Sequence, residues 1–408
     1  MKTGACRFCA APLELTFCDL GMSPLSNAFV KPAEAHRSET FYPLHAYVCE
    51  RCFLVQIEQF ETPEHIFGDY VYFSSYSDSW LGHCRRYAES MRAALGLGPQ
   101  SLVIEIASND GYLLQFFKEA GIPVLGIEPA RNVAAAAQGK GIPTLLEFFG
   151  AALASRLARE GGADLVVANN VMAHVPDLND FAAGLRHVLK PGGVLTVEVP
   201  HLLRLIEGHQ FDTIYHEHFS YFSFTTAQRV LARHGLAVHE VEQLPTHGGS
   251  LRIHAGPADA GRTAAPAVEA LLAEERRAGL GGREIYASFS EKAKHSKRAL
   301  LKFMIEAKNA GKHIAGYGAP AKGNTLLNYC GIRTDLLDYT VDRSPHKQGL
   351  LLPGTRIPVF GPEKIMETRP DYVLILPWNL KDEICGQMAG IRDWGGRFVV
   401  PIPEVTVI

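Results

Sequence analysis

The hydrophobic pattern is most regular between residues 80 and 255, where short apolar segments alternate with stretches of helical periodicity. Four of these segments are apolar on both faces, which is typical of strands buried inside a parallel sheet. Helices between such strands cover the two faces of the sheet, so the pattern predicts a doubly wound α/β domain. The predicted strands are 102–107, 123–129, 163–170 and 193–200.

A second, smaller α/β pattern follows. Residues 287–311 predict one long helix, apolar segments at 311–318, 337–342 and 371–377 predict strands, and a further helix is expected to begin near Lys322. The first 70 residues are rich in turns. We therefore expect an α/β protein with three domains: a small N-terminal domain (1–70), a central Rossmann-like domain (71–255) and a C-terminal Rossmann-like domain (256–408).

Composition excludes several classes of protein. The 408 residues are 47% hydrophobic and 20% charged, with a formal net charge of −3, which is ordinary for a globular protein. No apolar run reaches the roughly 18 residues that a membrane helix needs. The first residues lack the apolar run of a secretory signal, and no long basic run favours a nucleic-acid partner. We expect a cytoplasmic protein without membrane attachment, and the sequence leaves its oligomeric state open.

Two Cys-x-x-Cys pairs near the N-terminus give the strongest local signal: Cys6 with Cys9, and Cys49 with Cys52. One pair grips a tetrahedral ion from a tight turn, and a second pair completes a shell of four thiolates. Because a closed shell leaves no position for water, the pattern predicts a structural zinc ion. Cys18 is a rival ligand whose spacing fits less well. Four unrelated thiols are the alternative, although so few cysteines in 408 residues do not indicate a disulfide framework.

A candidate cofactor site follows the first predicted strand. Glu105 lies near the end of this strand, Gly111 lies at the turn into a helix, and Glu128 ends the next strand. A carboxylate in the last position accepts hydrogen bonds from the ribose hydroxyls of a nucleoside. The alternative is that these are ordinary strand-end carboxylates.

The loop between them argues against a dinucleotide. It presents Ala107 and Asn109 before its one glycine, whereas a pyrophosphate needs several glycines for close approach. A cofactor without phosphates, such as S-adenosylmethionine (SAM), fits better. Asn170 ends the third predicted strand and His174 follows it, so both are expected to face the same crevice at the carboxyl ends of the strands.

The segment 211–226 carries an unusual cluster of polar groups, in which Tyr215, His216, Glu217 and His218 are consecutive. Imidazole, carboxylate and phenol in one loop suit proton transfer near neutral pH. A metal site is less favoured because His-Glu-His lacks the helical spacing of His-Glu-x-x-His. A surface loop with hydrogen-bonded histidines is the structural alternative. A second aromatic group, Tyr72, Tyr76 and Trp80, precedes the central block and on composition alone predicts a packed connector.

Four motifs together carry a family resemblance: C-R-F-C with C-E-R-C, E-I-A-S-N-D-G-Y-L-L, Y-H-E-H-F-S-Y-F-S and G-Y-G-A-P-A-K-G-N-T. Over nearly its whole length the chain resembles the SAM-dependent C-methyltransferases that act on nucleotide-linked 4-keto-deoxysugars. The resemblance implies methylation of the carbon beside the ketone, usually C3 of a dTDP-linked sugar. The chain departs from the glycine-rich form of the cofactor loop at Ala107, where a methyl group is small enough for the site to survive.

The resemblance also implies roles for individual residues. His218 is expected to be the base that takes the C–H proton, with Tyr215 and Glu217 supporting it. Tyr76 and His174 resemble the other active-site groups, which hydrogen-bond the ketone or the enolate oxygen. For the C-terminal domain the resemblance implies that the sugar nucleotide is held there. The residues expected to hold it are Tyr317, Lys322 and Asn324.

Three other interpretations remain open. Asp342 ends a strand as a ribose-binding carboxylate would, so an NAD(P)-dependent sugar oxidoreductase is the first alternative, although the third glycine of the dinucleotide motif is missing. A C-terminal domain that serves as a lid without a ligand is the second. A zinc-ribbon adaptor without catalytic activity is the third, and the Tyr215–His218 cluster argues against it.

Overall fold

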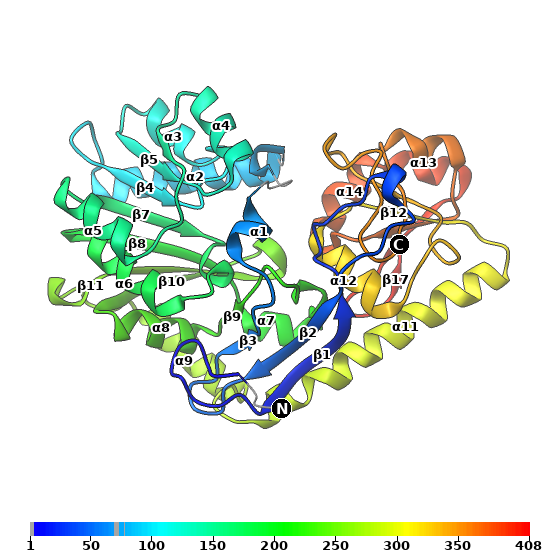
Figure 1. Ribbon diagram of the computed structural model, residues 1–408, viewed down its shortest axis with the longest axis horizontal. Helices are drawn as coiled ribbons and strands as arrows, with labels where there is room; N and C mark the ends of the chain where they lie inside the picture. The colour runs from blue at the N-terminus through cyan, green and yellow to red at the C-terminus, as the bar shows by residue number, and fades with distance from the viewer. Residues whose placement is uncertain (1–3, 69–72, 77) are drawn as a thin grey trace.

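The computed structural model describes residues 4–68, 73–76 and 78–408. Figure 1 shows two α/β lobes, with the long helix α11 (Phe289–Asn309) running beneath them and joining one to the other. The N-terminal strands β1 (Leu15–Ser23) and β2 (Tyr42–Val48) lie along this helix, between the two lobes. The chain is thus arranged so that segments from all three parts meet at the centre of the molecule.

The larger lobe contains a seven-stranded sheet in the order β10-β11-β8-β7-β4-β5-β6. The four strands predicted from the apolar pattern are confirmed, and they are parallel to one another. The strands β10 and β11 form an antiparallel hairpin, and β11 is also antiparallel to β8. The bounds are β4 (Val103–Ile106), β5 (Val124–Ile127), β6 (Thr144–Leu145), β7 (Ala163–Asn169), β8 (Leu189–Pro200), β10 (Leu236–Leu244) and β11 (Ser250–Pro257).

Helices cover both faces of this sheet. Apolar side chains of α2 and α3 form the core on one face, while those of α5, α6 and α8 form the core on the other. This is the two-sided covering that the strands, apolar on both faces, require. The helices are α2 (Asp78–Leu95), α3 (Leu114–Glu119), α4 (Arg131–Gly139), α5 (Ala151–Arg159), α6 (Leu178–Val188), α7 (Leu202–Glu207) and α8 (Phe224–Arg233).

The N-terminal sheet has the order β1-β2-β3-β9, where β3 is Val55–Ile57. Its last strand, β9 (Ser220–Tyr221), comes from the polar segment singled out in the sequence. Val55 pairs with Tyr221, and Gln56 pairs with Ser220. The backbone of the candidate catalytic loop is therefore anchored in the N-terminal sheet. A short helix, α1 (Pro63–Phe67), follows β3.

The smaller lobe has a six-stranded sheet in the order β14-β13-β12-β15-β16-β17, parallel except for β17. Its three predicted strands and the helix near Lys322 are confirmed. The strands are β12 (Ile314–Tyr317), β13 (Thr340–Val341), β14 (Val359–Phe360), β15 (Tyr372–Ile375), β16 (Arg397–Val400) and β17 (Thr406–Val407). The helices are α12 (Ala321–Cys330), α13 (Glu363–Thr368) and α14 (Lys381–Gln387), and α9 (Pro266–Arg277) and α10 (Glu284–Ala287) precede α11. Among the described residues, no helix is both long and apolar enough to cross a membrane.

Candidate functional site

The four paired cysteines converge in space. The sulfur atoms of Cys6, Cys9, Cys49 and Cys52 all lie within 4.8 Å of one another. The closest pairs, Cys9 with Cys49 and Cys6 with Cys52, are 3.5 Å and 3.6 Å apart. Four sulfurs at about 2.3 Å from one ion have comparable separations, so the thiols fit tetrahedral zinc. Cys18 lies apart from this cluster, buried in β1.

The cofactor loop after β4 has a left-handed backbone at alternate positions. Ala107, Asn109 and Gly111 have φ values of 56°, 49° and 76°. Glycine takes this conformation without cost, asparagine tolerates it, and an alanine is strained by roughly 1 kcal/mol. The position of Gly111 also excludes a side chain, since a Cβ atom there would lie 2.3 Å from the Ile142 side chain. The loop therefore keeps the shape of a glycine-rich turn although two of its three positions are not glycine.

Buried polar atoms gather at the carboxyl ends of β4 and β7. Glu105 is fully buried, and burial raises its pKa well above the usual range, an effect that the nearby hydroxyl of Tyr112 opposes. The side-chain amide of Asn169 and the Oδ1 atom of Asn170 have no hydrogen-bond partner in the described part of the chain. Because buried polar groups are normally paired, these atoms fit the amino, carboxylate and ribose groups of SAM. Glu105 and Asn170 thus lie at the carboxyl ends of neighbouring strands, and their role in binding the cofactor stays a prediction.

Glu128 holds the cofactor loop in place. Its carboxylate accepts hydrogen bonds from the backbone N–H groups of Asn109 and Ala130, both at 2.9 Å. Burial raises its pKa, and these two bonds oppose the rise. The Asn109 side chain in turn accepts a hydrogen bond from the backbone of Ser74 at 3.0 Å. The segment that precedes the central domain is therefore fastened to the cofactor loop.

The geometry of His218 fits a general base. Its Nδ1 lies 2.8 Å from the carbonyl oxygen of Thr213. A carbonyl can only accept, so Nδ1 carries the proton and Nε2 has the lone pair. Burial lowers the pKa of His218 well below its usual value, with further contributions from His174 and from the positive charge of Lys322. The imidazole is therefore neutral, and able to accept a proton, at neutral pH.

His174 and Tyr215 flank the imidazole of His218. The rings of His174 and His218 meet edge to face with centroids 4.6 Å apart, and the ring of Tyr215 lies 4.0 Å from that of His218. Burial lowers the pKa of His174 to about 4, although a hydrogen bond with the backbone of Glu217 opposes the shift. His174 stands on the short 3-10 helix η3 (Met172–His174), directly after β7. The site thus joins the end of the central sheet to the loop before β9.

The neighbouring residues Glu217 and His216 point in different directions. Glu217 is 3% exposed and accepts a 2.6 Å hydrogen bond from the side chain of Asn27, in the loop after β1. His216 instead lies 3.2 Å from the carbonyl oxygen of Pro43 and packs against Tyr42 of the N-terminal domain. The His-Glu-His run therefore does not assemble a metal site. Within the part of the chain that the structure describes, the metal-ligand cluster is the one formed by the cysteines.

The C-terminal lobe contributes a partly buried lysine to the same region. Lys322 donates to the side chain of Asn379 at 2.8 Å and stands 4.5 Å above the ring of Trp378. Trp378 donates its indole N–H to the fully buried Asp212, at 2.7 Å. Burial lowers the pKa of Lys322 and raises that of Asp212 to about 6. Asp212 directly precedes Thr213, whose carbonyl holds His218. The contacts of Trp378 with Lys322 and Asp212 therefore link the lysine to the segment that holds His218.

Three other predicted residues hydrogen-bond to partners outside the segment 215–218. Tyr317 hydrogen-bonds Gln387 at 3.3 Å within the C-terminal lobe. The amide of Asn324 donates to the carbonyl of Ser26 at 2.6 Å, so it fastens α12 to the N-terminal domain. Asp342, the candidate ribose carboxylate, accepts a 2.7 Å hydrogen bond from the backbone of Ala319.

The aromatic group before the central block lies at the boundary between the lobes. Tyr76 is 51% exposed and its hydroxyl is 3.4 Å from Nε2 of His346 in the C-terminal lobe. Trp80 stacks on His83 with ring centroids 5.0 Å apart and meets His247 edge to face at 5.3 Å. Tyr72 lies outside the described residues.

Four residues at this junction were not singled out in the sequence: Asn27, Asp212, His247 and Trp378. Asp212 belongs to the polar segment 211–226, and two glycines follow His247, which are signals that could have drawn attention to them. Asn27 and Trp378 carry no such local signal, because their role arises from contacts across more than 160 residues of sequence.

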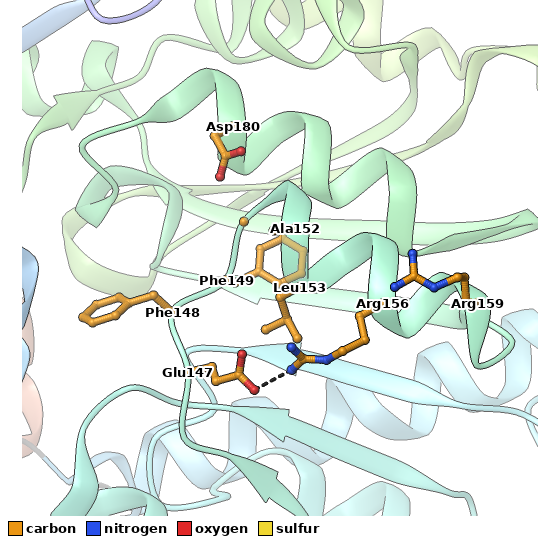
Figure 2. A pocket seen from close by; sticks show the side chains of 9 residues that line it. Glu147, Phe148, Phe149, Ala152, Leu153, Arg156, Arg159 and Asp180 are labelled. Carbon is orange, nitrogen blue, oxygen red and sulfur yellow. Dashed lines mark hydrogen bonds and ion pairs between the residues drawn. The ribbon is translucent and has the colours of Figure 1, made fainter.

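Two hollows on the described surface lie away from this site. Figure 2 shows one hollow beside α5 and α6, where Arg156 forms an ion pair with Glu147 and the side chain of Phe148 points away from the helices. A second hollow is lined by residues such as His209 and Pro403. Neither contains a residue that the sequence predicted for the cofactor or the chemistry.

Comparison with known proteins matches all three parts of the chain. Family models described as "Putative zinc binding domain", "Methyltransferase domain" and "C-methyltransferase C-terminal domain" match residues 6–67, 81–241 and 245–403. The C-methyltransferase NovU of Streptomyces niveus is 38% identical over 404 residues, which cover 99% of this chain and 96% of the relative. The ubiquinone biosynthesis O-methyltransferase of Rhodopseudomonas palustris is 30% identical over 118 residues, 28% of this chain and 45% of that protein.

Solved structures resemble part of the chain. The magnesium protoporphyrin IX methyltransferase of Synechocystis PCC 6803, crystallised with SAM, is 18% identical and covers 47% of this chain and 88% of its own, with a TM-score of 0.33.

Proposed function

Because the chain belongs to the C-methyltransferase family, we propose that it methylates the carbon beside the ketone of a nucleotide-linked 4-keto-deoxysugar. The protein is a SAM-dependent methyltransferase with a structural zinc site of four cysteines. The finer assignment is a dTDP-linked sugar with C3 as the methylated carbon. The position of His218 carries this proposal, because a C–H beside a ketone needs a neutral base aimed at the acceptor.

His218 begins the reaction. Its Nε2 takes the proton from the carbon, and the electron pair of the broken C–H bond moves toward the ketone, which gives an enolate. The carbonyl of Thr213, which holds Nδ1–H at 2.8 Å, fixes the tautomer and stabilises the imidazolium that forms. When bound, SAM supplies an electrophilic methyl group on a sulfonium centre. The carbon that His218 deprotonates would accept this methyl group, with S-adenosylhomocysteine as the other product.

The residues around the base support this step. We assign hydrogen bonding of the enolate oxygen to His174, whose ring meets that of His218. Tyr215 packs on the base, and Glu217 links the loop to Asn27. Tyr76 lies at the rim between the lobes, where it can close on a bound sugar. Holding both reactants in place supplies much of the acceleration.

Separate parts of the chain would hold the two reactants. The loop Ala107–Gly111 and the side chains of Glu105, Glu128 and Asn170 would hold SAM. Lys322 and Tyr317 of the C-terminal lobe would hold the sugar nucleotide. Asn324 is less suited to this role because its amide is engaged with Ser26. In this proposal the N-terminal domain (1–70) binds zinc, the central domain (71–255) binds SAM, and the C-terminal domain (256–408) binds the sugar nucleotide. Nucleotide sugars are cytoplasmic metabolites, so we also place the enzyme in the cytoplasm.

The oxidoreductase alternative has no support among the relatives, all of which are methyltransferases. A direct test of the proposal is proton exchange, followed by NMR in heavy water. The protein is incubated with a dTDP-4-keto-6-deoxyhexose, with and without SAM. The expected result is enzyme-dependent loss of the proton beside the ketone, and a new methyl signal when SAM is present. Binding of SAM without exchange or methylation would show that the acceptor is wrong.

A further inference from the structure

The turn between β10 and β11 lies at the edge of the sheet where the predicted site residues gather. β10 is antiparallel to β11, and β11 is antiparallel to β8, so β10 and β8 run in the same direction. Their carboxyl ends therefore lie at one edge. The backbone N–H of His201, just after β8, donates to the carbonyl of Gly249 in this turn at 3.0 Å. The turn thus belongs to the crevice side of the central lobe.

The backbone of this turn is unusual at three consecutive residues. His247, Gly248 and Gly249 have φ values of 56°, 90° and 113°. Glycine adopts such values freely, whereas a histidine in the left-handed region is strained. A Cβ atom on Gly248 would lie 2.5 Å from the indole of Trp378. The turn therefore packs closely against the C-terminal lobe. At position 247 the chain has a histidine, although glycine would adopt this backbone conformation with less strain.

The turn that carries His247 contacts residues of both lobes. The ring of His247 meets the edge of Trp80, which also packs against Tyr112 of the cofactor loop region at 6.0 Å. The next residue, Gly248, lies against Trp378 of the C-terminal lobe, and the ammonium of Lys322 lies 4.5 Å from the centre of the Trp378 ring. The electrostatic influence of His247 also reaches His218. His247 thus lies within electrostatic range of both His218 and Lys322.

One polar atom of this imidazole is buried without a partner. The Nδ1 atom of His247 has no hydrogen bond to any residue that the structure describes. Burial and the positive charge of Lys322 lower the pKa of His247 to about 4, so the ring is neutral at neutral pH. A neutral imidazole can donate from one nitrogen and accept at the other. His247 thus combines a strained backbone with a buried nitrogen that has no partner in the described part of the chain, which indicates that the residue serves ligand binding and not stability.

We propose that His247 is a substrate-contacting residue whose imidazole hydrogen-bonds an oxygen of the hexose held between the two lobes. This inference rests on the proposed function, since it takes the acceptor to be a nucleotide-linked sugar. The contact lies on the sugar rather than on the nucleotide. It fixes the orientation of the ring relative to His218 and the methyl donor.

The test compares the full-length His247→Gly and His247→Asn variants with the wild type. Glycine removes the imidazole and relieves the left-handed strain, while asparagine tolerates this backbone and restores a polar group. Arg369→Gly is the matched control, because Arg369 also has a positive φ of 48° but is exposed at the end of α13. For each protein we would measure the melting temperature, the Kd for SAM, the Kd for dTDP, and kcat/KM for a dTDP-4-keto-6-deoxyhexose.

We expect His247→Gly to lower kcat/KM at least tenfold while its melting temperature and both dissociation constants stay near the wild-type values. His247→Asn should recover part of the loss, and Arg369→Gly should keep full activity. An unchanged kcat/KM in His247→Gly, or a fall in melting temperature together with weaker SAM binding, would overturn the inference. A tenfold weaker dTDP complex would overturn the assignment to the sugar. If the wild type itself neither exchanges nor methylates the sugar, the proposed function fails, and this inference fails with it.

Discussion

The hydrogen bond between Asn27 and Glu217 makes the N-terminal domain a direct support of the catalytic loop. The Asn27 amide donates to Glu217 at 2.6 Å, and Glu217 is 3% exposed, so water cannot replace a lost donor at this oxygen. A hydrogen bond to a charged group is worth about 1.5–3 kcal/mol. We therefore expect Asn27→Ala to lower the free energy of unfolding by about that amount.

The same substitution should also slow catalysis, because Glu217 directly precedes His218. A small displacement of the loop that costs about 1.4 kcal/mol in the transition state would lower kcat tenfold. Asn27→Asp should have a larger effect than Asn27→Ala, because it places a second carboxylate against Glu217. Its activity should partly recover at lower pH, where one of the two carboxylates takes a proton.

Asn179→Ala is the matched control. The Asn179 amide also reaches the N-terminal domain, where it donates to the carbonyls of Arg7 and Phe8 at 3.0 Å and 3.2 Å. Its side-chain oxygen also accepts a 2.9 Å hydrogen bond from His234, and none of these partners belongs to the loop that carries His218, so we expect a loss of stability with an unchanged kcat. Thermal melting and steady-state kinetics with the sugar nucleotide measure both effects. If Asn27→Ala keeps the wild-type melting temperature and a kcat within twofold, the support that we assign to this bond does not exist.

Three further predictions concern the base, its neighbour and the cofactor loop. His218→Asn should leave the Kd for SAM unchanged and reduce turnover and proton exchange by about 100-fold or more, as the loss of a general base does; full activity would remove His218 from this role. The unfolded chain binds a proton at His174 below pH 6.5, whereas the folded chain binds it only below about 4, so stability falls as the pH drops through this window. Between pH 6.5 and 4 the free energy of unfolding of His174→Gln should therefore fall by up to about 3 kcal/mol less than that of the wild type. If the two proteins lose the same amount, the pKa shift of His174 is contradicted. Ala107→Gly should raise stability by up to about 1 kcal/mol and keep SAM binding within twofold, since the φ of 56° favours glycine; a lower melting temperature would show that the methyl group packs usefully.

The local sequence was sufficient for four parallel strands of the central sheet, for three strands of the C-terminal sheet and for the helices α11 and α12. Strands that are apolar on both faces were found because burial on two sides removes polar residues from the whole segment. The strand β10 was missed because it lies at the edge of its sheet, and its burial alternates along the strand. The cysteine pairs could be predicted because two ligands on one turn are fixed by local geometry, and the four sulfurs do converge.

What the sequence determined by itself is thus the set of reactive groups: the four thiols, the carboxylates at the strand ends, and the imidazoles of one short loop. Only the tertiary structure decided which of them face the site. His216 and His218 are two residues apart, yet one packs on Pro43 while the other stands against His174, because β9 is anchored in the N-terminal sheet. Lys322, His247 and Asn27 join the same region from three separate parts of the chain. Contacts over such separations depend on how whole domains pack, and no local spacing of residues encodes that packing.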